Sequence, residues 1–92
     1  MPEYIYYVSI SPVVEFKLRQ KHNLTGDLVR EAITYPAPTK QIWQYHKSYG
    51  MRLKVLGVLQ DGRQIVAYLH KNRYDKNIWN LATAYTIERK IR

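Results

Sequence analysis

The alternation of apolar and polar residues predicts one strand and then a helix at the start of the chain. Residues 4–10 are rich in aromatic and β-branched side chains, which is typical of a strand. Ser11 and Pro12 then indicate a helix start, because serine caps a helix N-terminus and proline suits the first helical position. This helix is expected to end near His22.

A second helix is predicted soon after the first. Thr25 suits the N-cap position, and Asp27 falls in the first turn, where the helix dipole favours an acid. Leu24 and Val29 have the spacing of a hydrophobic staple across the helix start. The helix must end before Pro36, because proline disfavours helical geometry in the residue that precedes it.

The rest of the chain predicts four short strands, at about residues 41–47, 52–59, 63–70 and 77–85. Asp61-Gly62 between the second and third of these is a strong hairpin signal. The order of strand, two helices and antiparallel meander predicts one α+β domain over residues 1–92. The helices are the only available cover for one face of the sheet. Function is therefore expected on the other face or its rim.

Charge is distributed unevenly between the two halves of the chain. Residues 1–39 carry four basic and four acidic side chains, whereas residues 40–92 carry eleven Lys/Arg and three acids, a sum of +8. A basic surface on a sheet favours a polyanion, with RNA or DNA as the first candidate, because phosphate neutralisation releases counterions. The alternative is a basic domain whose charge serves solubility alone.

The composition also limits the chemistry that is expected. The chain has no cysteine, which excludes disulfides, thiolate zinc sites and cysteine nucleophiles. Its three histidines show no metal-ligand spacing, so neither a metal nor a cofactor is expected. No signal peptide is recognisable, and no apolar run approaches the roughly 18 residues of a spanning helix. We therefore expect a cytoplasmic protein without a membrane partner.

Candidate site residues come first from the basic strands. Arg52 and Lys54 are two positions apart on one strand, so they point to the same face. Their neighbours on the next strand depend on the hairpin loop. A two-residue loop places Lys71 beside Arg52, whereas a three-residue loop shifts the register by one and places His70 beside Lys54. The sequence leaves both registers open.

Further candidates lie at strand ends. Arg73 belongs to a run of cations that can clamp phosphates, which arginine does bidentately. Tyr85 ends the last strand and can donate a hydrogen bond to a phosphate or stack on a base. His46 is a candidate for proton transfer, because histidine exchanges protons near neutral pH. His22 is expected to cap the last carbonyls of the first helix.

The set of arginine, lysine, histidine and tyrosine suits cleavage of RNA. No carboxylate pair, nucleophilic triad or glycine-rich phosphate loop is present. When a ribose 2′-hydroxyl attacks the adjacent phosphate, the protein need only orient the groups, neutralise charge and assist proton transfer. Such a reaction requires no metal.

An ordered series of segments also carries a family resemblance. The segments are Lys17–Thr25 with its Lys-His and turn, Val29–Ile33, Gly50-Met51-Arg52 to Gly57, Gly62-Arg63 to Tyr68, and Ile78–Tyr85. Over about residues 15–88 they resemble the BrnT family, a branch of the RelE/ParE-like toxins of bacterial type II toxin–antitoxin systems. In the family, the last of these segments ends in Ala-Arg.

The resemblance implies a RelE-like fold and a ribonuclease that cleaves mRNA. It also implies a cognate antitoxin, itself DNA-binding, in a toxin–antitoxin hetero-oligomer, with a homodimer as another possible state. Arg52 matches the family arginine most directly, Arg73 matches loosely, and Tyr85 stands where the family has arginine. The charged C-terminal helix of the family is nearly absent. The alternative is a non-catalytic nucleic-acid-binding or protein-interaction module on the same fold.

Overall fold

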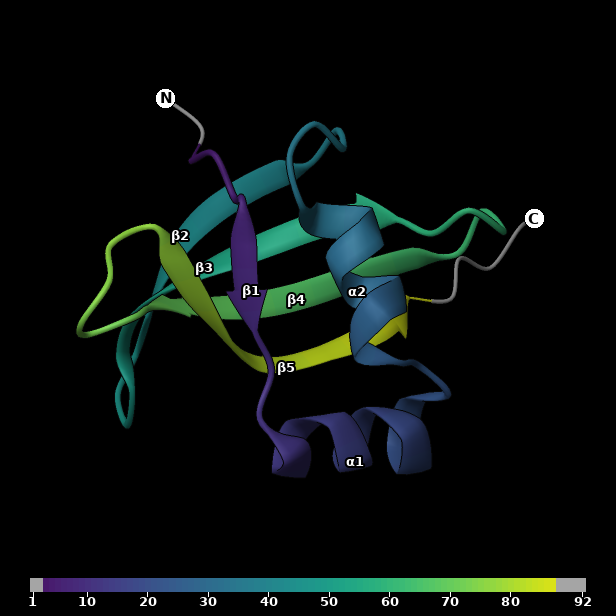
Figure 1. The fold of residues 1–92 in the computed structure, drawn as a ribbon, viewed down its shortest axis with the longest axis horizontal. Coiled ribbons are helices and arrows are strands. Elements are labelled where there is room, and N and C mark those ends of the chain that lie inside the picture. The colour runs from purple at the N-terminus through teal and green to yellow at the C-terminus, as the bar shows by residue number, and fades with distance from the viewer. Residues whose placement is uncertain (1–2, 88–92) are drawn as a thin grey trace.

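The computed structural model describes residues 3–87 and has the predicted α+β class (Figure 1). The five predicted strands and two predicted helices are all present. Predicted features at residues 88–92 lie outside the described residues. The elements in order are β1 (Tyr7–Ser9), α1 (Pro12–His22), α2 (Gly26–Ile33), β2 (Lys40–His46), β3 (Gly50–Val58), β4 (Gln64–Lys71) and β5 (Ile78–Ile87).

The strands form one sheet in the order β1-β5-β4-β3-β2. The antiparallel meander from β2 to β5 is confirmed. The first strand is shorter than predicted and pairs in parallel with β5, with Tyr7 opposite Ile78 and Ser9 opposite Asn80. The sheet is therefore mixed.

Local capping explains why the helix bounds agree with the prediction. Ser11 accepts a hydrogen bond from the Val14 N–H at 3.2 Å, and Thr25 accepts one from Leu28 at the same distance. Asn23 ends α1 in the left-handed conformation, at a φ of 50°. Both N-cap side chains satisfy N–H groups that a helix start leaves without an intrahelical partner.

The carboxylate of Glu15 joins the two helices. Its oxygens accept hydrogen bonds from the Gly26 N–H at 2.9 and 3.1 Å, at the N-terminus of α2. This backbone hydrogen bond lowers the pKa of Glu15 from its usual 4.5, and Arg19 at 2.8 Å lowers it further. The charged form of Glu15 therefore stabilises the folded state.

Glu15→Gln is expected to lower the thermal midpoint at pH 7 and to have a much smaller effect near pH 3. A pKa that is lowered on folding contributes stability above the unfolded value, and this contribution is lost as pH falls through the folded value. Thermal melts followed by circular dichroism at the two pH values measure the difference. An equal decrease in the thermal midpoint at both pH values would show that the charge of Glu15 does not contribute to stability.

The hydrophobic core lies on one face of the sheet. Its strand residues alternate along β3 and β4, including Leu53, Val55 and Ile65, and they pack with α2 residues such as Val29. Figure 1 shows α2 across β3 and β4, with α1 beside β5. The two helices therefore do not cover the sheet equally, because α1 packs mainly against β5.

A close approach of α2 to β3 depends on a glycine. A Cβ at Gly57 would lie 2.7 Å from the Ala32 carbonyl oxygen. Gly57 therefore lets the helix backbone lie directly on the strand.

The opposite face of the sheet is not covered by either helix. Val66 and Tyr68 on this face are nevertheless only 2% and 9% exposed, and they lie outside the core cluster. Side chains of neighbouring strands must cover them. We call this face the open face; it carries Gln44 on β2, Arg52 and Lys54 on β3, Tyr68 and His70 on β4, and Tyr85 on β5.

Within residues 3–87, no helix has the length and apolar character needed to cross a membrane.

Candidate nucleic-acid interface

The loop between β3 and β4 decides which of the two registers is correct. The Leu59 N–H donates to the Arg63 carbonyl at 2.8 Å, so three residues form the loop, and Gly62 adopts a φ of 92°. Lys54 then lies opposite Tyr68 and Leu53 opposite Leu69. The three-residue alternative is confirmed, and Arg52, Lys54 and His70 share the open face.

The placement of Lys71 beside Arg52 is wrong. Lys71 points to the helix side of the sheet, with its ammonium 5.6 Å from the centre of the Trp79 ring. The same ammonium lies 3.9 Å from a carboxylate oxygen of Glu3. The register shift of one residue has exchanged the faces of His70 and Lys71.

The guanidinium of Arg52 stacks on the ring of Tyr68, with 3.9 Å from Cζ to the ring centre. Its Nε is buried and has no hydrogen-bond partner, and no ion pair joins Arg52 to any described residue. Stacking orients the planar group; the buried Nε is shielded from a ligand, and the terminal Nη groups make no hydrogen bond or ion pair with a described residue. An arginine held in this way is prepared for an anion, and the donor fork matches phosphate geometry.

Tyr85 extends this cluster toward α1. Its hydroxyl lies 3.5 Å from the Tyr68 hydroxyl, and its ring centre lies 6.3 Å from that of His22. The hydrogen bond with Tyr68 and burial raise the pKa of Tyr85, while the charge of Arg52 acts in the opposite direction. Tyr85 therefore keeps its proton at neutral pH, so it can act there as a hydrogen-bond or proton donor. His22, predicted only to cap α1, lies beside this donor.

His46 belongs to a second cluster, at the end of the β2–β3 hairpin. Its ring centre lies 4.7 Å from that of Tyr49, which in turn lies 6.1 Å from the ring of His70. The Ser48 N–H donates to Nδ1 of His46 at 3.0 Å, so the proton of the neutral ring is on Nε2. The structure thus brings His46 and His70 together and separates His46 from Tyr85.

Arg73 lies in the exposed loop between β4 and β5. That loop is organised by Asn72, whose side chain accepts from the Tyr74 and Asp75 N–H groups and donates to Asn80 at 3.1 Å. No hydrogen bond or ion pair joins Arg73 to the Arg52 cluster among the described residues. The structure places Arg73 on the rim.

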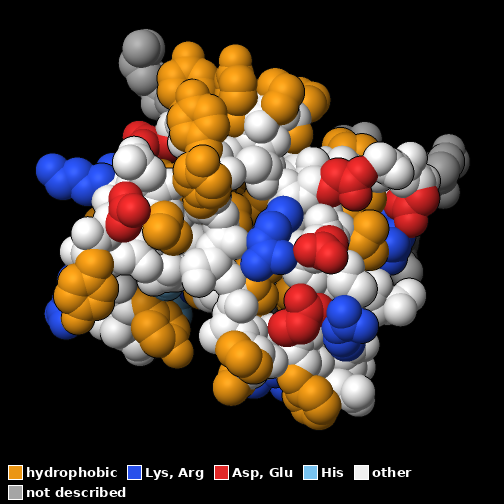
Figure 2. All heavy atoms as spheres, viewed as in Figure 1, with side chains coloured by type: hydrophobic (Ala, Val, Ile, Leu, Met, Phe, Trp, Pro, Cys, Tyr) orange, Lys and Arg blue, Asp and Glu red, His pale blue; other side chains and the backbone are white. Residues whose placement is uncertain are grey.

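The open face and the helix side differ in how their charges are paired. None of the five strands contains Asp or Glu, and the open face carries Lys40, Arg52 and Lys54. On the face seen in Figure 2, acidic and basic side chains lie close together. Four ion pairs are described: Arg19–Glu15, Arg30–Asp27, Arg63–Asp61 and Lys71–Glu3. The cations of the open face lack such partners among residues 3–87.

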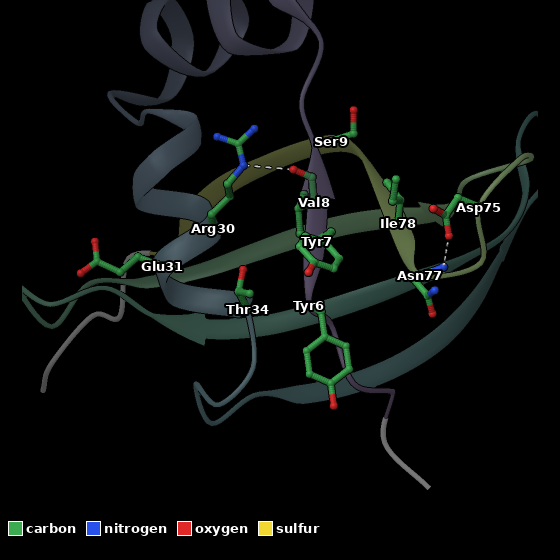
Figure 3. A pocket seen from close by; sticks show the side chains of 10 residues that line it. All are labelled: Tyr6, Tyr7, Val8, Ser9, Arg30, Glu31, Thr34, Asp75, Asn77 and Ile78. Carbon is green, nitrogen blue, oxygen red and sulfur yellow. Dashed lines mark hydrogen bonds between the residues drawn. The ribbon is translucent and has the colours of Figure 1, made fainter.

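A hollow of about 740 Å³ lies elsewhere, between β1, α2 and the start of β5 (Figure 3). Its arginine, Arg30, is already engaged, because Nε donates to the Val8 carbonyl at 3.0 Å and Nη1 lies 3.1 Å from Asp27. Glu31 and Asp75 also line the hollow. This chemistry does not favour a polyanion, so the open face is the better candidate.

Tyr68 and Tyr49 were not singled out from the sequence. The available signal for Tyr68 was its alternation with His70 on one strand, but the face of that strand depended on the loop. Tyr49 falls in a turn, where the sequence gives no direction for a side chain. The structure places Tyr68 against Arg52 and Tyr49 between the rings of His46 and His70.

Among residues 3–87, no three His, Asp or Glu side chains are grouped closely enough to hold a metal ion. Comparisons with protein-family models, with curated proteins and with solved structures return no match for this chain.

Proposed function

We propose that the open face binds single-stranded RNA and cleaves it by attack of a ribose 2′-hydroxyl on the adjacent phosphate. The observation that carries the proposal is Arg52, which is stacked on Tyr68 and makes no ion pair with a described residue. Because the strands contain no Asp or Glu, no carboxylate on them repels an approaching phosphate backbone.

The geometry supports a distribution of roles. Arg52 neutralises the phosphate oxygens, on which negative charge builds up in the transition state. Tyr85, protonated at neutral pH, donates to a phosphate oxygen or to the leaving 5′-oxygen, and His22 or His70 accepts the 2′-hydroxyl proton. A bond forms between the 2′-oxygen and phosphorus while the bond to the 5′-oxygen breaks. The products are a 2′,3′-cyclic phosphate and a 5′-hydroxyl.

The resemblance of residues 15–88 supports a more specific biological role. We propose a BrnT-like toxin with a RelE-like fold that acts on mRNA in the cytoplasm. Its partner would be a DNA-binding antitoxin in a hetero-oligomer, and a homodimer is the other state to test.

Expression without a partner is expected to slow growth and translation; normal growth with abundant folded protein would count against an active toxin.

A second candidate function is RNA binding without cleavage. It is favoured by Tyr85, which stands where the resembling family has arginine and whose raised pKa makes it a weaker proton donor. In this case the open face would hold RNA and leave it intact.

Incubation with end-labelled single-stranded RNA in the presence of EDTA separates the two candidates. Cleavage predicts fragments with 2′,3′-cyclic phosphate and 5′-hydroxyl ends, and DNA of the same sequence must stay intact because it lacks the 2′-hydroxyl. Bound but intact RNA would identify the non-catalytic function. Absence of binding would contradict both.

Binding of RNA is expected to depend strongly on salt, with a slope of log K against log salt of roughly −2. Each phosphate contact with a single strand contributes about −0.7, and the open face offers Lys40, Arg52 and Lys54. Lys54→Glu should flatten the slope by about one contact, whereas Arg19→Glu on α1 should leave it nearly unchanged. Titrations at several salt concentrations measure these slopes. Equal losses from both variants would show that the open face is not the binding surface.

A further inference from the structure

Tyr49 is an exposed aromatic ring that lies against the ring of His46. Its N–H donates to the His46 carbonyl at 3.2 Å, which closes the turn between β2 and β3. Its ring lies against that of His46 at a tilt of 33°, and the hydrogen bond from Ser48 holds the imidazole in place. Tyr49 is nevertheless 66% exposed. Contacts on the hairpin orient this ring, but it does not contribute to the core.

The pairing of the strands places this ring cluster beside Arg52. On β2, Gln44 lies opposite Arg52 and His46 lies opposite Gly50, so His46 is the diagonal neighbour of Arg52 on the open face. Diagonal neighbours of this kind lie about 7–8 Å apart. On β4, His70 follows Tyr68, the residue on which Arg52 stacks. A group one ribose away from a phosphate at Arg52 can therefore reach Tyr49.

We propose that Tyr49, supported by His46 and His70, is a stacking subsite for one base of a single-stranded RNA. This subsite rests on the proposed function, because the phosphate of the same nucleotide would bind at Arg52. Aromatic side chains stack on any base, since every base has a π-face, so the subsite favours single strands over duplexes without selecting a sequence. The neighbouring rings of His46 and His70 restrict Tyr49 and so reduce the entropy lost on binding.

The arrangement also assigns different ligand atoms to the two ends of the open face. Arg52 with Tyr68 and Tyr85 provides cationic and hydroxyl donors for the phosphate, whereas the hairpin provides aromatic faces for the base. Loss of Tyr49 should then weaken affinity without changing the number of phosphate contacts. A loss of affinity with an unchanged salt slope therefore distinguishes a base subsite from an additional electrostatic contact.

The test uses a single-stranded RNA pentamer with 2′-O-methyl riboses, which the proposed reaction cannot cleave, and with one 2-aminopurine, a fluorescent adenine analogue quenched by stacking. Its binding to the wild type and to Tyr49→Ala, Tyr49→Phe and Tyr45→Ala is measured by anisotropy and by fluorescence. Tyr45 is a matched control, because it is an exposed tyrosine of the same hairpin on the other face of β2. Circular dichroism melts establish that each variant is folded.

Tyr49→Ala is expected to bind roughly tenfold to a hundredfold more weakly, to lose the quench and to keep the salt slope. Tyr49→Phe should retain both affinity and quench, and Tyr45→Ala should behave as the wild type. Salt-dependent binding that is equal in the wild type and Tyr49→Ala would overturn the subsite and leave the proposed function standing. Absence of binding by the wild type would overturn the proposed function and the subsite with it.

Discussion

Arg52→Ala is expected to reduce RNA cleavage by at least about a hundredfold while the protein stays folded. Removal of one donor to a developing oxyanion typically costs a factor of about 10²–10³ in rate. Arg52 makes no hydrogen bond within the described structure, and its loss removes the stack on Tyr68 and part of the cover of that ring. Such a cation–π contact contributes about 0.5–1 kcal/mol at exposed sites and about 2 kcal/mol when desolvated, and the buried Nε places Arg52 between the two. The effect on activity should therefore far exceed the effect on stability.

Two further variants complete this test. Arg52→Lys keeps the charge but loses the planar fork, so its activity should be intermediate. Lys71→Ala removes a cation from the helix side and should leave cleavage unchanged. Initial rates on a labelled RNA measure all three. Equal losses from Arg52→Ala and Lys71→Ala would show that total charge, and not the open face, determines activity.

Leu53→Ala is expected to lower the free energy of unfolding by about 2–5 kcal/mol, because it truncates a leucine within the core. Leu53 is 1% exposed and faces α2, one position from Arg52 on the same strand. Equilibrium unfolding in urea measures the loss. Arg52→Ala provides the contrast, since alternate residues of β3 face opposite sides of the sheet. Greater destabilisation by Arg52→Ala than by Leu53→Ala would reverse the assignment of the two faces.

The sequence predicted those elements that depend on local chemistry. Ser11, Thr25 and Asn23 act at the helix ends through contacts within a few residues, so the bounds of α1 and α2 could be anticipated. The meander followed from strand patterns and the turn at Asp61-Gly62. The parallel pairing of β1 could not be predicted in the same way, because three residues with a distant partner carry no periodic signal.

Only part of the candidate site could be predicted, because the rest depends on the register between β3 and β4. Alternation along β3 placed Arg52 and Lys54 together without any knowledge of the fold. The choice between His70 and Lys71 required the loop length, which differs by a single residue between the two registers. The stack of Arg52 on Tyr68 depends in turn on that register. Strand periodicity shows which residues of one strand share a face, but the length of the turn decides which residues of the next strand lie on that same face.

The parallel pairing of β1 with β5 also determines when the sheet can be completed during synthesis of the chain. Tyr7 leaves the ribosome well before its partner Ile78, which belongs to the last strand described. Until then Val8, a core residue, has no strand beside it, and the outer edge of β4 is also unpaired. Unpaired edges favour association between chains. A nascent chain that stops before β5 therefore cannot close its sheet, and completion of the fold must wait until β5 has been synthesised.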